Sequence, residues 1–524
     1  MVTEAGKRRT FAIISHPDAG KTTITEKLLY HGGAIRETGE VKGKSGKKAA
    51  MSDWMTLEKE RGISITSSVM QFMYGELKIN LLDTPGHKDF GEDTYRTLIA
   101  ADSAAMLIDA AKGVEKQTRQ LFDVCRMRKI PIFTFANKMD REGIDSLELI
   151  DDVESTLGIK CIPMTWPIGM GDRFRGLFHR MHNKLYLYEK GKVEPEVIAV
   201  SSWEDPIIKE YVSEELYEKF LEDMELLEIA LGPFEVDDFL RGDVSPMSFG
   251  SAKNNWGVDL FLEIFAKYAP APQPREFDTG SISPDDKEFS GFIFKIQANM
   301  DKKHRDRIAF LRVCSGEFER GMKVKHMRLN RELRLAYASE FMAKDRGTVD
   351  NAFAGDIVGI VDTGNFQIGD SISSGKKINF PPFPKFSPEM FASLYIKDPL
   401  KKKRLQKGVN QLAEEGAIQV FIDPLIGEQE PLIGVVGELQ FEVLLYRLND
   451  EYNLDVRLDR LPYSVARWPK NKHGEDVSDV KGAERMFQDS DGNPVVLLAQ
   501  AWDIGWLEKE NPDMVFTVGD RHET

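Results

Sequence analysis

Three short segments carry side chains that could bind a nucleoside triphosphate. The first reads Ser15-His16-Pro17-Asp18-Ala19-Gly20-Lys21-Thr22-Thr23 and lies between an apolar run and a helical pattern. Free N–H groups at a helix start, together with the helix dipole, can hold phosphate oxygens. We expect Lys21 to reach the β- and γ-phosphates and the Thr22 hydroxyl to bind Mg²⁺. Ser15 stands where such a loop usually has its first glycine, so the segment alone is weak evidence and could be an ordinary helix start.

The second segment, Asp83-Thr84-Pro85-Gly86-His87, directly follows an apolar run at 78–82. An acidic residue at the C-terminal end of a parallel strand lies beside the phosphate loop, so Asp83 can hold Mg²⁺ through water. The Gly86 N–H can approach the γ-phosphate because no side chain obstructs it. His87 would then lie where an attacking water must be oriented. By itself Asp-Thr-Pro-Gly is an ordinary turn sequence, but its position after a strand favours the nucleotide interpretation.

The third segment, Asn137-Lys138-Met139-Asp140, follows the apolar run 131–136. The Asp140 carboxylate can accept from both N1–H and the exocyclic amine of guanine, whereas adenine would leave it unpaired, which a buried site penalises heavily. Asn137 would bond the base edge and the loop backbone, and the Lys138 stem would lie against the base plane. A capped helix start is the alternative for any one such motif. The ordered trio makes that alternative unfavourable and predicts a GTP site.

The elements that must position these segments alternate between short apolar runs and helical patterns. Strands are expected at 10–15, 68–74, 78–82, 104–109, 131–136 and 246–249, and helices at 21–30, 115–128 and 146–157. This alternation predicts βαβ units in a mostly parallel sheet, with 68–74 and 78–82 as an antiparallel hairpin at its edge. The expected GTP-binding domain spans 1–275 and contains an acidic helical insertion at about 170–243.

Proline-rich segments divide the rest of the chain. Between them, at 286–382, short β-rich runs at 291–297, 308–315, 322–327, 333–339 and 356–362 predict a small antiparallel β-barrel domain. Beyond them, 388–524 is expected to form a ferredoxin-like α+β domain with a C-terminal extension. Its predicted order is strand 390–397, helix 400–415, strands 417–422 and 431–436, helix 438–451 and strand 454–458. The predicted fold class is therefore multidomain α/β, and after 461 only 495–498 suggests a strand.

Bulk composition excludes several classes of protein. No apolar run approaches the length of a membrane span, and three scattered cysteines cannot form a disulfide framework or a metal cluster, so we expect a cytoplasmic chain without a membrane partner.

The net charge of −15 comes mostly from 204–243, which alone contributes −11. Net charge therefore does not argue against a nucleic-acid partner. The default interpretation of the acidic segment is a solvated outer face, with a partner-binding role as the minority alternative.

The first two nucleotide segments and a further segment, Arg61-Gly62-Ile63-Ser64-Ile65, together resemble the corresponding motifs of translational GTPases. The resemblance implies that Arg61, Gly62, Ile63 and Ser64 form the first switch. Ser64 stands in place of the usual threonine and keeps the hydroxyl that ligates Mg²⁺, which makes Thr22, Ser64 and Asp83 the implied metal residues. Phe249-Gly250-Ser251-Ala252-Lys253 resembles the last guanine-contacting loop of the family, displaced by an insertion as in elongation factor G. His87 is the implied catalytic residue.

Further segments resemble the bacterial release factor 3 family in particular. They are 294–301, 304–307, 397–400, 414–417 and 437–441, and the chain contains no Gly-Gly-Gln, the tripeptide with which peptide-releasing factors trigger hydrolysis. The resemblance implies a termination factor with GTP or GDP and Mg²⁺ as cofactors. It also implies that the protein is a monomer when it is not bound to the ribosome. The implied partners are the ribosome, both its rRNA and its proteins, and the codon-reading release factors, which it would help to dissociate after peptide release.

Two other functions stay open. The chain could be an elongation or ribosome-protection type GTPase, or a GTP-dependent scaffold without turnover that binds a protein through the acidic insertion. The run 397–407 carries six basic residues, for which a solvated face and contact with rRNA phosphates are about equally favoured.

Overall fold

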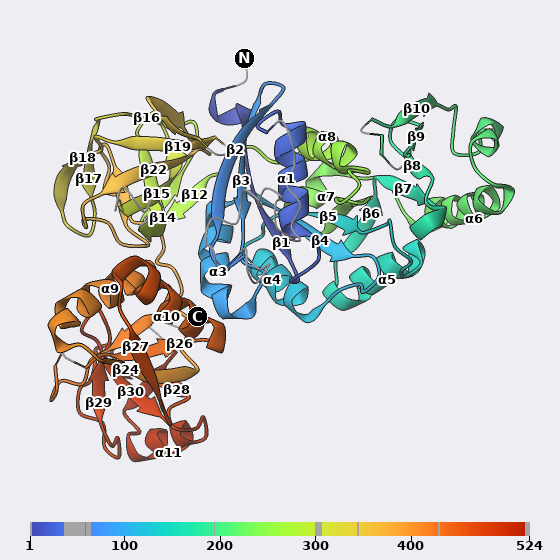
Figure 1. Ribbon diagram of the computed structural model, residues 1–524. Helices are drawn as coiled ribbons and strands as arrows, with labels where there is room; N and C mark the ends of the chain where they lie inside the picture. Colours follow the sequence, from blue (N-terminus) through green and yellow to red (C-terminus); the bar gives the residue numbers. More distant parts are fainter. Residues whose placement is uncertain are drawn as a thin grey trace.

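The computed structural model describes residues 3–35, 58, 64–189, 191–192, 194–298, 307–342, 345–427 and 430–518. A central α/β unit carries an extension at the right of Figure 1, a β-rich unit at its upper left and a C-terminal α/β unit at its lower left. The expected fold class, multidomain α/β with an antiparallel β unit, is confirmed. The expected order of elements in the ferredoxin-like part, strand, helix, two strands, helix and strand, is confirmed as well.

The strands of the central sheet lie in the order β2-β3-β1-β4-β5-β11-β6. Apart from β2 its neighbours are parallel, and nearly every residue of the inner strands is buried, because helices cover both faces. The strands are β1 (Arg8–Ser15), β2 (Ser68–Tyr74), β3 (Leu77–Asp83), β4 (Ser103–Asp109), β5 (Ile132–Asn137), β6 (Lys160–Pro163) and β11 (Val244–Phe249).

Alternate residues of β1 point to opposite cores. Phe11 and Ile13 pack against one group of helices, and Ala12 and Ile14 against another. The first group is α1 (Lys21–His31), α7 (Val236–Arg241) and α8 (Val258–Tyr268); the second is α3 (Gly91–Ala100), α4 (Lys116–Met127) and α5 (Ser146–Leu157). The sheet is therefore a rigid middle layer whose C-terminal strand ends can hold a site.

The strand β2 does not form a free sheet edge as expected. It pairs antiparallel with β3, which confirms the hairpin, but Gln71 also pairs with Met342 of β19 (Ala338–Met342). The Gln71 amide donates to the Ile357 carbonyl at 3.1 Å, and the Thr10 hydroxyl donates to the Gly355 carbonyl at 2.7 Å. The bridge to β19 covers part of the β2 edge, and the two buried side-chain bonds join the central sheet to the β-rich unit.

The extension differs from the helical insertion that we expected at about 170–243. Its first part is a four-stranded antiparallel sheet, β10-β9-β8-β7, and only its second part is helical. The bounds are β7 (Thr165–Ile168), β8 (Gly176–His179), β9 (Lys184–Leu187), β10 (Glu196–Ala199) and α6 (Glu214–Ala230). Strands of four residues are too short to show a period. Contact with α6 stabilises them: the Phe178 ring meets Phe220 edge-on at 5.5 Å.

The β-rich unit encloses its own apolar core, which includes Ile293, Leu311 and Val358. The run 333–339, expected as one strand, is interrupted between Arg334 and Ala338. Its larger strands are β14 (Ser290–Ala298), β15 (Arg307–Ser315), β17 (Lys323–His326), β18 (Arg331–Arg334), β19, β20 (Asp345–Thr348) and β22 (Ile357–Asp362). Three-residue strands complete it: β16 (Glu317–Glu319), β21 (Asn351–Phe353) and β23 (Ser371–Ser373). A separate hairpin, β12 (Arg275–Phe277) and β13 (Gly280–Ile282), precedes the unit.

The C-terminal unit contains two antiparallel sheets. The first has the order β25-β26-β24-β27 and is covered by α9 and α10. Its elements are β24 (Met390–Ile396), α9 (Lys402–Glu414), β25 (Gln419–Phe421), β26 (Leu432–Val435), α10 (Glu438–Tyr452) and β27 (Val456–Leu461). The second sheet, β29-β30-β28-β31, lies in the tail, where the sequence predicted only a strand at 495–498, and that strand is β30. It is built from β28 (Val465–Asn471), β29 (Met486–Gln488), β30 (Pro494–Leu498) and β31 (Met514–Thr517), beside α11 (Asp503–Glu510).

Cys125, Cys161 and Cys314 are free and buried. Burial raises the pKa of the Cys125 thiol to about 12, which makes it a poor nucleophile near neutral pH. In the part of the chain that the structure describes, no helix has both the length and the apolar character needed to span a membrane.

Candidate GTP-binding site

The first predicted segment connects β1 to α1, as its pattern suggested. Gly20 precedes the helix with φ of 102°, and Asp18 is also left-handed at 66°. Ser15 is not among the residues with positive φ, so a small side chain is tolerated where glycine is usual. A Cβ on Gly20 would lie 2.3 Å from Asn137 Nδ2, and that amide donates to the Ala19 carbonyl at 2.7 Å. The first and third segments are thereby held together.

Lys21, Ser64 and Asp83 meet in a buried cluster. The Lys21 ammonium lies 2.9 Å from Asp83 Oδ1 and 3.1 Å from the Ser64 hydroxyl oxygen. The Asp83 carboxylate offsets the cost of burying the ammonium. Thr22 follows Lys21 in the first turn of α1. Hydroxyl and carboxylate oxygens are the donors that Mg²⁺ prefers, so Thr22, Ser64 and Asp83 fit the expected metal role.

The second segment lies against the first. The Thr84 hydroxyl donates to the Ile13 carbonyl at 2.6 Å and so ties the end of β3 to β1. A methyl group on Gly86 would meet Pro17 Cα at 3.5 Å, an ordinary contact. No described neighbour therefore requires glycine at position 86, and the approach of its N–H to a phosphate stays a prediction.

His87 caps a short 3-10 helix, η2 (Lys88–Phe90). Its Nδ1 accepts a hydrogen bond from the Asp89 N–H at 3.3 Å, and Asp89 Oδ1 lies at the same distance from that nitrogen. The ring is 6.4 Å from the Phe90 ring and its side chain is 35% exposed. One ring nitrogen is therefore engaged in a local contact, and the ring is partly open to solvent.

The predicted guanine residues converge from two loops. The Ser251 hydroxyl donates to Asp140 Oδ1 at 2.6 Å, and the Ala252 N–H donates to Asn137 Oδ1 at 2.9 Å. Lys253 Nζ lies 3.9 Å from Asp140 Oδ2. The Ser251 bond fixes the orientation of a carboxylate that we expect to read the base edge.

Asp109 belongs to this site and was missed by sequence reasoning. It ends β4, and its Oδ2 lies 2.7 Å from the Lys138 ammonium, which orients the lysine stem. The rule that identified Asp83, an acidic residue at the C-terminal end of a parallel strand, also applies to Asp109 and could have found it.

Part of the expected first switch, Arg61, Gly62 and Ile63, lies outside the described residues. Ser64 is described, as is Glu58, whose Oε1 accepts from the Ile65 N–H at 2.9 Å and from the Thr66 N–H at 3.2 Å. A buried carboxylate therefore anchors the backbone immediately after Ser64.

The residues that directly follow Ser64 and His87 contact the C-terminal unit. Asp89 Oδ2 accepts from the Leu439 N–H at 2.9 Å, in the first turn of α10. Ile65 and Phe90 form a buried apolar cluster with Leu439 and Val443. Sequence reasoning did not anticipate this interface, because its members are far apart along the chain.

Three sequence families match successive parts of the chain. Residues 6–271 match the elongation factor Tu GTP binding domain, 288–375 match elongation factor G domain 2, and 380–508 match class II release factor RF3, C-terminal domain. A curated relative from Symbiobacterium thermophilum, named peptide chain release factor 3, is 52% identical over 514 residues, which are 97% of each chain. The chain belongs to the peptide chain release factor 3 family.

A second peptide chain release factor 3, from Gloeobacter violaceus, is 49% identical over 520 residues and 98% of each chain. A crystal structure of a protein from Thermus thermophilus has a TM-score of 0.70 at 25% identity and covers 92% of this chain and 72% of that one. Membership of the release factor 3 family identifies a GTPase release factor that acts in translation termination.

Proposed function

We propose that this chain uses Mg²⁺ and GTP to bind the ribosome and to promote dissociation of the codon-reading release factors after peptide release. The observation that carries the proposal is the contact of Ile65, Asp89 and Phe90, the residues that follow Ser64 and His87, with α10. Ser64 lies against Lys21, and the next residue, Ile65, packs on Leu439. A change at the nucleotide would therefore be transmitted to the C-terminal unit.

We assign the binding roles to the residues that the sequence predicted. Residues 15–23 would hold the phosphates, and 83–87 would contact the γ-phosphate. Asn137, Lys138, Met139 and Asp140 would hold guanine together with Ser251, Ala252 and Lys253. Bound Mg²⁺ supplies positive charge that neutralises the phosphate oxygens during transfer to water. The domain limits 1–275, 286–382 and 388–524 are part of the same proposal.

Ribosome stimulation follows from the state of His87. Its Nδ1 is held by the Asp89 N–H, and the ring packs beside Phe90. Orienting water beside a γ-phosphate requires a defined ring position, whereas here the ring is bonded to its own short helix and is partly open to solvent. Contact with the ribosome would supply that position, as partners in trans do for other GTPases.

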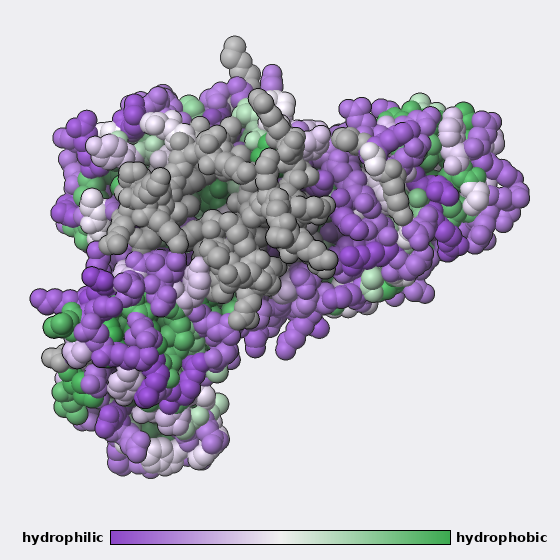
Figure 2. All heavy atoms as spheres, in the orientation of Figure 1, coloured by the Kyte–Doolittle hydropathy of each residue, from purple (hydrophilic) through white to green (hydrophobic). Residues whose placement is uncertain are grey.

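The basic run 397–407 supplies a surface for rRNA. Lys402, Lys403, Arg404 and Lys407 are exposed at the start of α9. Leu400, which precedes them, is 94% exposed. In Figure 2 hydrophobic side chains lie among hydrophilic ones over this lower-left unit. Exposed cations beside an apolar side chain are suited to binding RNA, because the cations pair with phosphates and the counterions of the RNA are released.

The deciding experiment is a multiple-turnover GTPase assay with post-release ribosomes, with and without a bound codon-reading release factor. We expect slow turnover by the free protein, strong stimulation by ribosomes, and faster recycling of the bound factor. Equal turnover with and without ribosomes would contradict the mechanism. Stimulation without faster recycling would favour an elongation or ribosome-protection role. Unchanged turnover in His87→Ala would favour a scaffold.

A further inference from the structure

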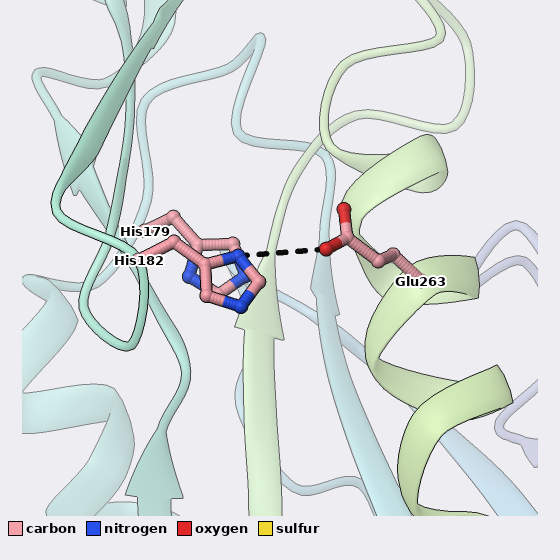
Figure 3. A group of neighbouring side chains, drawn as sticks. All are labelled: His179, His182 and Glu263. Carbon is pink, nitrogen blue, oxygen red and sulfur yellow. Dashed lines mark ion pairs between the residues drawn. The ribbon is translucent and has the colours of Figure 1, made fainter. Parts of the chain in front are cut away.

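Two histidines and a glutamate gather where the extension meets the central unit, and none of the three belongs to the nucleotide segments. His179 ends β8, His182 lies in the turn to β9, and Glu263 projects from α8 toward the two rings (Figure 3). Their ligand atoms all lie within 4.8 Å of one another. The group therefore spans two parts of the fold and has the dimensions of a metal site.

His179 has buried polar atoms that the described residues leave unsatisfied. The residue is 2% exposed, and neither ring nitrogen has a hydrogen-bond partner among the described residues. Its ring stacks on the His182 ring with centroids 4.3 Å apart and planes 6° apart. Burial, followed by the neighbouring His182, lowers the pKa of His179 to about 4, so the ring is neutral near pH 7. A buried lone pair without a donor is unfavourable, and a metal ion would satisfy it.

The other two members leave a path for an ion. His182 Nδ1 lies 3.5 Å from Glu263 Oε1, which is at the outer limit of a hydrogen bond. Their side chains are 33% and 43% exposed, so one side of the cluster faces solvent. Lys184 and Lys267 add positive charge near His179, which opposes a cation, but Lys267 is exposed and therefore screened by salt.

We propose that His179, His182 and Glu263 bind one divalent transition-metal ion, with Zn²⁺ as the expected occupant. Two imidazoles and one carboxylate are a ligand set that suits Zn²⁺, with water in a fourth position. Imidazole binds a metal in the plane of its ring, so the His182 ring, which is 33% exposed, would turn out of its stack on His179 to share the ion. Mg²⁺ prefers oxygen ligands alone and would stay at the nucleotide.

The ion would join the turn between β8 and β9 to α8. The same junction is already braced by an aromatic stack, in which the Phe174 and Trp256 rings lie 4.7 Å apart and 5° from parallel. Trp256 lies a few residues after the Ser251–Lys253 loop. Glu263 lies further along the chain, in α8. The ion is therefore a structural brace of the extension, and GTP affinity should change little when it is removed.

The test is a calorimetric Zn²⁺ titration of the full chain, freed of metal with chelator and held with excess GDP and Mg²⁺. We expect one Zn²⁺ per chain and a higher melting temperature after binding. His182→Ala and Glu263→Gln should each weaken Zn²⁺ binding by roughly 100-fold or more, since each removes a ligand and loss of an outer-shell partner alone typically costs 10–100-fold. His473→Ala, which removes an exposed histidine in the C-terminal unit, is the matched control and should bind like wild type.

A second measurement does not depend on the variants. Co²⁺ in place of Zn²⁺ should give the visible absorption of a low-symmetry four-coordinate ion with nitrogen and oxygen ligands, and Zn²⁺ should abolish it. Failure to bind an equimolar amount of Zn²⁺ would overturn the proposal. So would Zn²⁺ affinity that is unchanged in both His182→Ala and Glu263→Gln, because the ion would then lie elsewhere.

Discussion

Asp89 Oδ2 accepts a hydrogen bond at 2.9 Å from the Leu439 N–H, a contact between residues 350 positions apart. Leu439 lies in the first turn of α10, where backbone N–H groups lack partners within the helix and where negative charge is favourable. Asp89 also supplies the N–H that holds His87 Nδ1. One residue therefore contacts both the expected catalytic histidine and the C-terminal unit.

Gly437→Ala should loosen this contact. A Cβ at position 437 would lie 2.1 Å from Asp89 Cγ, so the helix start or the Asp89 side chain must shift, which typically costs about 1–3 kcal/mol. Hydrogen exchange should show faster exchange of the Leu439 amide. Gly505→Ala in α11 is the control, because a Cβ there meets no atom of the described residues within 4 Å outside its own stretch of helix. Wild-type exchange at Leu439 in Gly437→Ala would show that the contact does not hold the two units together.

Lys21→Ala should abolish measurable GTP binding, because it removes the ammonium expected to pair with the phosphates. It also leaves the buried Asp83 carboxylate without its cation at 2.9 Å. Fluorescence of a labelled GTP analogue measures the affinity. Lys116→Ala, at the exposed start of α4, removes equal charge outside the cluster and should bind normally. Undiminished affinity in Lys21→Ala would refute the assignment of the phosphate loop.

Asp140→Asn should change which base is bound. Guanine presents two donors, and an amide offers only one acceptor in place of the carboxylate, so GTP affinity should fall by about 100-fold or more. Xanthine carries a carbonyl where guanine has its amine, so the new amide can donate to it. Competition between GTP and xanthosine triphosphate measures the change. An unchanged preference for GTP would mean that Asp140, although held by the Ser251 hydroxyl at 2.6 Å, does not contact the base.

Acid should destabilise the metal-free protein through His179. Burial lowers the folded-state pKa of His179 from 6.5 to about 4, so the unfolded chain binds more protons between these values. The free energy of unfolding should therefore fall by up to about 3 kcal/mol as the pH drops from about 6.5 toward about 4. Thermal unfolding in chelator across this range tests it. His179→Gln should flatten that part of the profile, and an equally steep profile in the variant would assign the effect to other groups.

The sequence alone determined the parallel sheet and the place of the nucleotide segments. Local patterns suffice here, because a buried parallel strand is a continuous apolar run and residues that follow such strands converge at one edge of the sheet. The structure brings Lys21 to Asp83 and Asn137 to Ala19 as that rule requires. The same rule applied to Asp109 would have completed the set.

Only the tertiary structure decided the four short strands 165–199, the closure of the β2 edge, the Asp89–Leu439 bond and the cluster of His179, His182 and Glu263. Each depends on contacts between segments far apart along the chain. Four-residue strands have no readable period, and a lone aspartate or histidine has no pattern that names its partner. Packing of whole elements supplies that information, because it fixes which side chains are left facing each other.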